Sequence, residues 1–291
     1  MLLVATPAVP QESQSKRAAV GATSGRRLTV DGVALAYDEE GAGPPVVCLH
    51  AIGHGARDFA RLRAHLRGRH RVIALDWPGQ GASGADHVPA SAGRYADLLA
   101  MFLDAARVDR AVIVGNSIGG AAAMRYAHRH PDRVRALVLE NPGGLDPATD
   151  LVGRMAVGAM IRFFGAGARR AWWYPRAFAA YYRMVLPGAP AADQRRHIVT
   201  SGVEIAPLLH EAWRSFGMPD ADIRALVPKV GCPVLFAWAT RDQFIQLRRC
   251  RPAIARFPNA AVETFAAGHA AHLETPDLFE ASLDRFLATL T

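Results

Sequence analysis

Cysteine and lysine are both scarce in this chain. The three cysteines, Cys48, Cys232 and Cys250, are odd in number and scattered, so they indicate reduced side chains rather than a disulfide framework. Only Lys16 and Lys229 are lysines, so nearly all of the positive charge behind the net +8 comes from arginines spread along the chain. Such a spread is typical of solvated surfaces and predicts no nucleic-acid partner.

Long apolar runs and cofactor motifs are absent as well. No stretch approaches the roughly 20 apolar residues of a membrane span, and Met1–Val4 is too short for the core of a signal peptide. We therefore expect no membrane partner, and the reduced cysteines favour a cytoplasmic protein. No cluster has the spacing of metal ligands, and no Gly-x-Gly-x-x-Gly follows a strand-like run. The sequence thus predicts neither a metal nor another cofactor.

Short apolar runs alternate with helical segments over most of the chain. An Asp-Gly turn between 28–30 and 33–37 predicts an opening hairpin. Further strands are expected at 46–49, 72–75, 111–114, 134–139, 234–238 and 261–265. Helices are expected at 59–66, 95–106, 119–130, 246–256 and 278–290. This alternation predicts the α/β class, with a mostly parallel sheet of eight strands flanked by helices.

A Gly-x-Ser-x-Gly motif stands where one of these strands meets a helix. Ser117 lies in Gly115-Asn116-Ser117-Ile118-Gly119, directly after the apolar run 111–114 and before the small-residue helix. A strand that turns into a helix within one or two residues strains the corner residue and exposes its hydroxyl, and the flanking glycines leave room for the turn. The alternative is an ordinary helix N-cap serine, but the placement favours a nucleophile.

A serine nucleophile needs a base and an orienting acid, and the chain offers both in two versions. Asp242 follows the strand-like run 232–238, and Glu140, at the end of another strand, is its rival as the acid. His269 follows a glycine before the last helix, with His272 three residues along as its rival. We favour Asp242 and His269, which gives the chain order Ser, Asp, His.

With these motifs in place, the chain from about Leu28 onward resembles cap-bearing members of the α/β-hydrolase superfamily. Three further segments carry the likeness. They are 49–55, similar to the family's His-Gly segment, 76–83, which reads Asp-Trp-Pro-Gly-Gln-Gly-Ala-Ser, and Gly268-His269 followed by Glu274-Thr275-Pro276, similar to the family's catalytic-histidine segment. The resemblance implies an oxyanion hole made by the backbone N–H groups of Ile118 and Ile52. Ala51 stands where the family usually has glycine.

The resemblance also implies a domain layout. It consists of a flexible arm at 1–27, a core at 28–144 and 229–291, and a helical cap at 145–228. The cap stretch lacks β-branched runs, and some of its large apolar side chains are expected to line a substrate pocket while the rest pack its helices: Met155, Met160, Phe163, Phe164, Trp172, Trp173, Phe178, Tyr181, Tyr182, Met184 and Trp213.

The other histidines are expected to have lesser roles. His50 is predicted to be a structural hydrogen-bonding residue beneath the oxyanion loop, and His54 faces either the pocket or solvent. His128 and His130 belong to a helix end, where cationic side chains are ordinary.

The function that follows is a serine hydrolase cleaving an ester or lactone of a small apolar substrate through an acyl-enzyme. Carbon–carbon hydrolysis of a ring-cleavage product is an alternative, although the tryptophan that such enzymes usually carry after the catalytic histidine is replaced by Ala270. A cofactor-free perhydrolase has the same triad. A ligand receptor with a residual triad is the non-enzymatic alternative.

Overall fold

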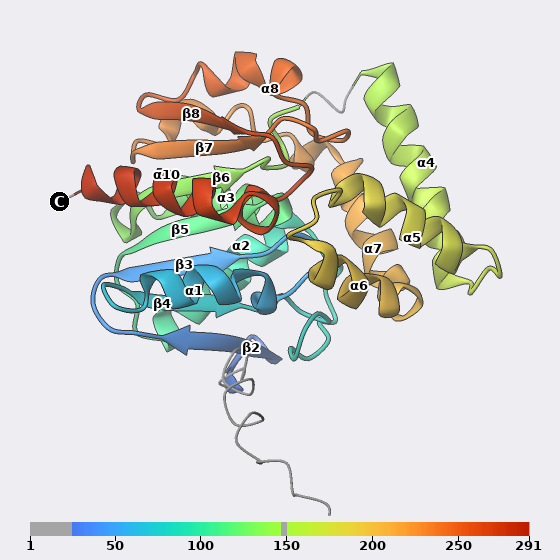
Figure 1. The fold of residues 1–291 in the computed structure, drawn as a ribbon, viewed down its shortest axis with the longest axis horizontal. Helices are drawn as coiled ribbons and strands as arrows, with labels where there is room; N and C mark the ends of the chain where they lie inside the picture. The colour runs from blue at the N-terminus through green and yellow to red at the C-terminus, as the bar shows by residue number, and fades with distance from the viewer. Residues whose placement is uncertain (1–24, 147–149, 291) are drawn as a thin grey trace, which may run out of the picture.

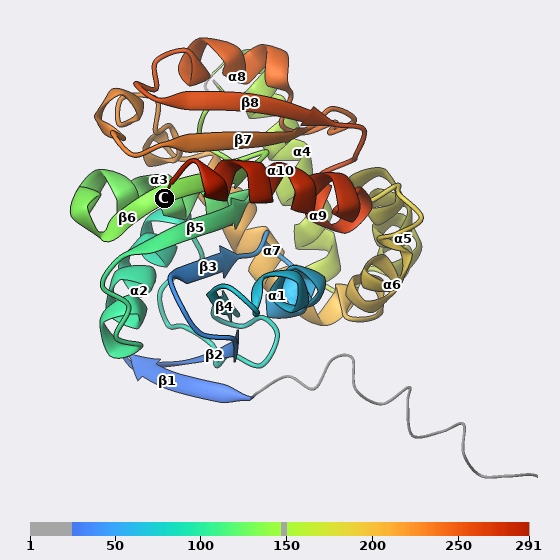
Figure 2. The ribbon, with the colours of Figure 1, turned by 60° about the vertical axis from the view of Figure 1, so that its left-hand side comes forward.

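The computed structural model describes residues 25–146 and 150–290 and contains one eight-stranded sheet. The strands are β1 (Arg26–Val30), β2 (Val33–Glu40), β3 (Pro45–Leu49), β4 (Arg71–Leu75), β5 (Ala111–Asn116), β6 (Val134–Glu140), β7 (Val234–Ala239) and β8 (Ala260–Phe265). Their spatial order is β1-β2-β4-β3-β5-β6-β7-β8 (Figures 1 and 2). β1 and β2 pair antiparallel, as do β2 and β4, and all other neighbours are parallel. The predicted mostly parallel sheet is therefore confirmed.

Helices cover both faces of this sheet, because the strands present apolar side chains alternately to either side. They are α1 (Ala60–Leu66), α2 (Ala92–Ala105), α3 (Ile118–Arg129), α8 (Leu247–Ile254), α9 (Ala271–Glu274) and α10 (Pro276–Ala288). On β3, Val47 and Leu49 pack in the same apolar cluster as α2, α3 and α8, whereas Val46 and Cys48 pack in the cluster of α1, α9 and α10. This continuous burial explains why the strands have no polar alternation.

The ends of several elements differ from the predicted ones for local reasons. The predicted arm at 1–27 lies largely outside the described residues, but Arg26 and Arg27 already belong to β1, where they pair with Tyr37 and Ala36. The α2 helix starts at Ala92 because the Ser91 hydroxyl accepts the Arg94 N–H at 3.1 Å. The last helix begins at Pro276, a residue favoured at the first helical position.

Four further helices separate β6 from β7: α4 (Leu151–Ala168), α5 (Tyr174–Val185), α6 (Ala192–Thr200) and α7 (Gly202–Phe216). We call them the helical insertion. They lie together at one end of the sheet, beyond the carboxyl ends of its parallel strands (Figure 1). Their interior is an aromatic cluster in which Phe164 and Phe178 are fully buried. The insertion therefore has a core of its own and faces the site that the strand ends form.

The first insertion helix is unusually apolar for its exposure. By length and composition, α4 could cross a membrane, with a mean hydropathy of 1.3 and only 22% of it buried. The expectation that no stretch approaches a membrane span overlooks this helix. In the structure α4 packs along α7, so its buried side belongs to the insertion.

Candidate active site

Ser117 occupies a strained corner between β5 and α3. Its backbone has φ 55° and ψ −116°, a conformation costly for a residue with a side chain. A Cβ added at Gly115 would lie 2.8 Å from the Gly119 carbonyl oxygen, and one at Gly119 would lie 2.4 Å from the Leu49 carbonyl oxygen. Only glycine fits at either position. The Ser117 side chain makes no capping hydrogen bond to α3, so the N-cap alternative does not hold.

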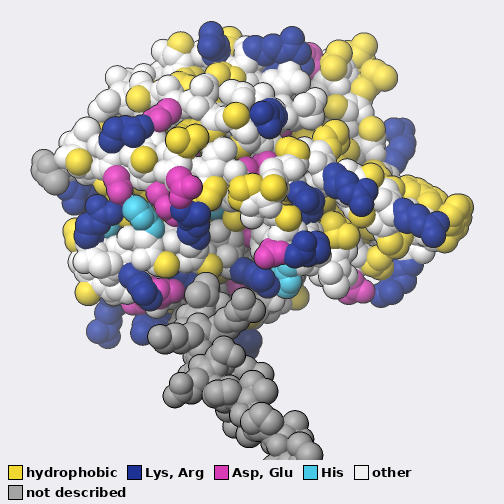
Figure 3. All heavy atoms as spheres, in the orientation of Figure 1, with side chains coloured by type: hydrophobic (Ala, Val, Ile, Leu, Met, Phe, Trp, Pro, Cys, Tyr) yellow, Lys and Arg dark blue, Asp and Glu magenta, His cyan; other side chains and the backbone are white. Residues whose placement is uncertain are grey.

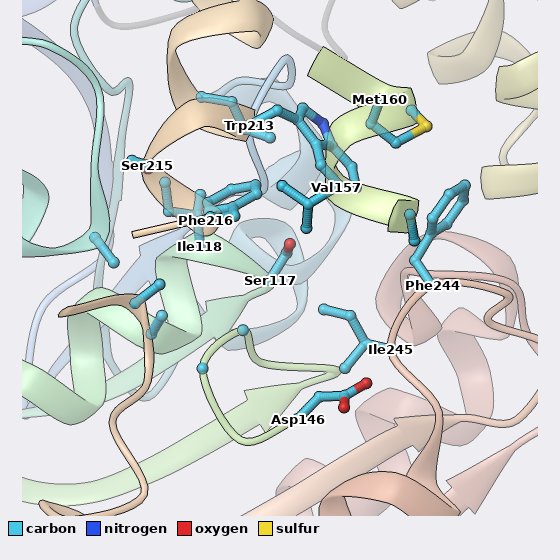
Figure 4. Close-up of a pocket in the computed structure, with 18 of the residues that line it drawn as sticks. Ser117, Ile118, Asp146, Val157, Met160, Trp213, Ser215, Phe216, Phe244 and Ile245 are labelled. Carbon is cyan, nitrogen blue, oxygen red and sulfur yellow. The ribbon is translucent and has the colours of Figure 1, made fainter. Parts of the chain in front are cut away.

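The amino end of α3 offers unpaired backbone donors beside this serine. Ile118 is the first residue of α3, and the first helical hydrogen bond runs from the Ala121 N–H to the Ser117 carbonyl. The N–H of Ile118 therefore has no partner within the helix and carries the positive end of its dipole. Ile118 lies beside Ser117 in the same cavity wall (Figure 4). Its position fits the predicted oxyanion donor.

The loop after β3 forms the opposite wall. The Gly53 N–H is occupied, because it donates to the Gln80 side-chain oxygen at 2.6 Å. Ile52 lines the cavity and thus remains the donor candidate on this side. The Asp76 carboxylate holds the loop to the turn after β4 by accepting the N–H groups of Ala56 at 2.6 Å and Ala82 at 2.9 Å. This is the structural use of the Asp-x-Pro-Gly segment.

The structure places Asp242 against His269. The Asp242 carboxylate and the Nδ1 of His269 are 2.7 Å apart and both side chains are buried. The same carboxylate oxygen accepts the Asn141 side-chain amide at 2.9 Å, and the other accepts the Phe244 N–H at 2.8 Å. A carboxylate held on both oxygens fixes the imidazole ring and leaves Nε2 as the atom that can act on Ser117.

The rival pair is also present, but it is a separate buried pair. Glu140 accepts both the backbone N–H and the Nδ1–H of His272, each at 3.0 Å. His272 belongs to the short helix α9, and its ring stacks on Phe59 with centroids 4.6 Å apart. Unlike His269, His272 is not among the residues that line the cavity. The two candidate acids and two candidate bases thus form two separate pairs, Asp242 with His269 and Glu140 with His272.

His269 has a raised pKa. Burial alone would lower it, but the attraction of the Asp242 carboxylate and its hydrogen bond outweigh that penalty. The pKa of His269 is therefore above its ordinary value, and the neutral ring is a stronger base than a free imidazole.

Two residues to which sequence reasoning gave no role hold the histidine loop in place. The Asn116 side-chain amide donates to the carbonyl of His269 at 2.9 Å and to that of Glu140 at 3.1 Å. The Glu274 carboxylate accepts the Gly268 N–H at 2.8 Å and, with its other oxygen, the Gly188 N–H of the helical insertion at 2.7 Å. Asn141 was missed too. A polar residue next to a catalytic motif is the only signal that the sequence offers for them.

The two histidines of the oxyanion loop have different surroundings. His50 is a structural residue as expected: Nδ1 lies 2.7 Å from the Ala51 carbonyl, and Nε2 accepts the Trp77 N–H at 3.0 Å. His54 was expected to face either the pocket or solvent, and in the structure it lines the cavity. Its Nδ1 lies 2.5 Å from Asp58, a buried carboxylate that Gln194 of the insertion also contacts.

The cavity above Ser117 has a volume of about 790 Å³ and lies between the core and the helical insertion. Figure 4 shows the Ser117 hydroxyl pointing into it, with Val157, Met160, Trp213 and Phe244 around it. Of the large apolar side chains of the insertion, Met160, Tyr181, Tyr182 and Trp213 line the cavity, whereas Phe164 and Phe178 pack inside the insertion. Within residues 25–146 and 150–290, no group of three possible metal ligands occurs.

Comparison with known proteins agrees with this geometry. A family model for the alpha/beta hydrolase fold matches residues 44–161. A pimeloyl-[acyl-carrier protein] methyl ester esterase of Chromobacterium violaceum is 29% identical over 255 residues, covering 86% of this chain and 96% of the relative. A 2-hydroxy-6-oxo-2,4-heptadienoate hydrolase of Pseudomonas putida is 38% identical over 130 residues, 43% of this chain and 47% of the relative.

A solved structure extends the likeness to the whole fold. The structure of Est816, described as an N-acyl homoserine lactone degrading enzyme, matches with a TM-score of 0.70 and 25% identity, covering 90% of this chain and 100% of that one. The chain belongs to the α/β-hydrolase superfamily. It is a hydrolase of α/β type, with esterases among its relatives.

Proposed function

We propose that this protein is a serine hydrolase that cleaves an ester or lactone of a small apolar substrate through an acyl-enzyme. The observation that carries the proposal is that Ser117, with its strained backbone, and His269 line the same cavity. His269 is in turn hydrogen-bonded to Asp242 at 2.7 Å. A hydroxyl, a base and an orienting acid in this arrangement are the requirements of nucleophilic acyl transfer.

In this mechanism His269 removes the Ser117 proton as the hydroxyl oxygen attacks the substrate carbonyl carbon. Asp242 keeps Nδ1 protonated and stabilises the imidazolium that forms. The negative charge on the carbonyl oxygen is held by the N–H groups of Ile118 and Ile52, each worth about 3 kcal/mol of the barrier. His269 returns the proton to the leaving alcohol and then activates the water that releases the acid.

The cavity wall supports an apolar substrate. Val157, Met160, Trp213 and Ile245 surround the space above Ser117 (Figure 4), and a volume of about 790 Å³ lies within the usual range for small-molecule sites. The esterase and lactone-degrading relatives act on carbonyl substrates of this reaction class.

The p-nitrophenyl esters from acetate to decanoate test the proposal. We expect kcat/KM to rise by up to about fourfold for each added methylene, because burying one is worth about 0.8 kcal/mol, until the acyl chain fills the cavity. The chain-length optimum then measures the depth of the site. No turnover of any member would contradict simple esterase activity.

Carbon–carbon bond hydrolysis is the second candidate, favoured by the relative from Pseudomonas putida. A dienoic ring-cleavage product distinguishes it, because loss of the dienoate absorbance reports carbon–carbon cleavage directly. Turnover of this compound with no turnover of the nitrophenyl esters would replace the first proposal by the second.

The raised pKa of His269 predicts a pH dependence. The base acts as the neutral imidazole, so activity is lost as the pH falls through the pKa of His269. We expect kcat/KM for p-nitrophenyl butyrate to decline tenfold per pH unit below a midpoint that lies above the ordinary histidine value of about 6.5. A pH–rate profile measures it, and a midpoint below that value would show that Asp242 does not act on the base.

A further inference from the structure

The outer side of the helical insertion carries an unusual set of charges. Residues 151–187 contain six arginines and no aspartate, glutamate or lysine: Arg154, Arg162, Arg169, Arg170, Arg176 and Arg183. All six are exposed, and none forms an ion pair with any residue in the described ranges. Elsewhere in the chain, exposed arginines commonly have acidic partners, as Arg61 has in Glu280 and Arg129 in Asp97. These six cations therefore lack an acidic partner within the described fold.

Large apolar side chains are exposed on the same stretch. Leu151, Val152 and Met155 on α4 are each 66% exposed, and Trp172, in the turn before α5, is 84% exposed. Trp173 and Met184 are exposed as well. Figure 3 shows hydrophobic and basic side chains side by side along the edge that α4 and α5 form. Monomeric soluble proteins seldom expose so many large apolar residues together, so this edge has the character of an interaction surface.

We propose that the edge formed by α4, residues 169–173 and α5 docks on the surface of an anionic phospholipid bilayer. Unpaired guanidinium groups match lipid phosphates in geometry and charge. Exposed leucine, methionine and tryptophan insert at the boundary between headgroups and acyl chains, where indole rings are favoured. An acidic protein would match the arginines, but the apolar residues are scattered between the charges, and a fluid bilayer accommodates such a pattern without needing a complementary shape.

The docking edge is continuous with the mouth of the cavity. Val152 and Arg154 of α4 are exposed and also line the cavity, and so does Met218, which is 58% exposed. A bilayer seated on this edge would face the route to Ser117. On the proposed hydrolase function, the substrate class would then be apolar esters dissolved in or released from a membrane. The expectation of no membrane partner rested on the lack of a spanning segment, and peripheral docking needs none.

Vesicle co-sedimentation of the full chain tests the proposal. The probes are phosphatidylcholine vesicles with and without phosphatidylglycerol, at low and high salt. We expect binding only to the anionic vesicles, weakened by salt. Arg176→Gln with Arg183→Gln should lower the partition coefficient about thirtyfold, since each basic residue near such a surface is worth about 1 kcal/mol. Trp172→Ser should lower it about tenfold.

Matched controls remove the same groups from positions outside the docking edge. Arg251→Gln with Arg256→Gln removes two exposed arginines of the α8 region, and Leu278→Ser removes a side chain that is 63% exposed on α10. Both controls should bind as the wild type does. Equal loss in a control and in its test variant would overturn the proposal, because net charge or general hydrophobicity would then be the cause.

Three further outcomes also test the docking proposal. Failure of the wild type to bind anionic vesicles at low salt overturns the proposal. A dimer in analytical ultracentrifugation that Trp172→Ser dissociates would identify a second copy as the occupant, again overturning it. Binding of Ser117→Ala equal to that of the wild type would support it, and this result is independent of catalysis, so docking and hydrolysis can fail separately.

Discussion

Ser117→Ala is expected to abolish ester hydrolysis, lowering kcat by about a million-fold while leaving the fold intact. The effect is large because the attacking atom is removed, and only the oxyanion donors and the cavity remain to favour the reaction over water. The substitution removes an oxygen from a cavity and breaks no capping hydrogen bond of α3. The measurement is turnover of p-nitrophenyl butyrate, with thermal unfolding as the check on stability.

A matched control lies in the same cavity. Ser215 also lines it, and its hydroxyl donates to the Ala212 carbonyl at 2.8 Å rather than facing His269. Ser215→Ala should therefore change kcat by less than about tenfold. A fluorophosphonate probe should add its mass to the wild type and to Ser215→Ala but not to Ser117→Ala. Labelling of Ser117→Ala at another serine would disprove the assignment of the nucleophile.

The second large effect is expected for Asp242→Asn, which should lower kcat by about ten-thousand-fold. Asparagine is nearly the same size, but its amide can present a donor to Nδ1 and thereby stabilise the wrong histidine tautomer. Loss of the carboxylate charge also removes the attraction that raises the pKa of His269. The midpoint of the acid limb of any residual activity should therefore move to lower pH. A pH–rate profile with p-nitrophenyl butyrate measures both the loss of kcat and the shift of the acid limb.

Glu140→Gln is the control for this experiment, since Glu140 pairs with His272 instead. We expect it to destabilise the fold by about 1–3 kcal/mol, because a buried charged hydrogen bond is weakened. The acid limb of the pH profile should move less than in Asp242→Asn, because Asp242 raises the pKa of His269 more strongly than Glu140 does. If Glu140→Gln shifted that limb and Asp242→Asn did not, the acid would have been assigned to the wrong pair.

The architecture could be predicted from sequence because its signals are local. Continuous apolar runs such as 111–114 and 234–238 specify strands buried on both faces, and Asp31-Gly32 specifies the first turn. The position of Ser117 could be predicted for the same reason. A strand, two spaced glycines and a helix are neighbours in the chain, so their geometry needs no distant contact.

The supporting residues could not be predicted, because their partners are distant in sequence. Asn141 meets Asp242 across 101 positions, and Glu274 meets Gly188 across 86. No local sequence pattern around Asn141 or Glu274 indicates which residue it will contact.

The positions of the aromatic side chains of the insertion could not be predicted for a related reason. Phe164 and Trp213 look alike as apolar residues on helices, and only the packing of α4 against α7 decides that Trp213 lines the cavity.

The backbone contact between Gly119 and Leu49 separates chemistry from selectivity. A Cβ at Gly119 would lie 2.4 Å from the Leu49 carbonyl oxygen, so α3 and the strand before the oxyanion loop meet main chain to main chain. Their relative position is set without any side chain of the cavity. Residues such as Met160 and Trp213 come from another part of the chain altogether. Changes in these insertion residues can thus reshape the substrate cavity, while the backbone contact that positions α3 is kept.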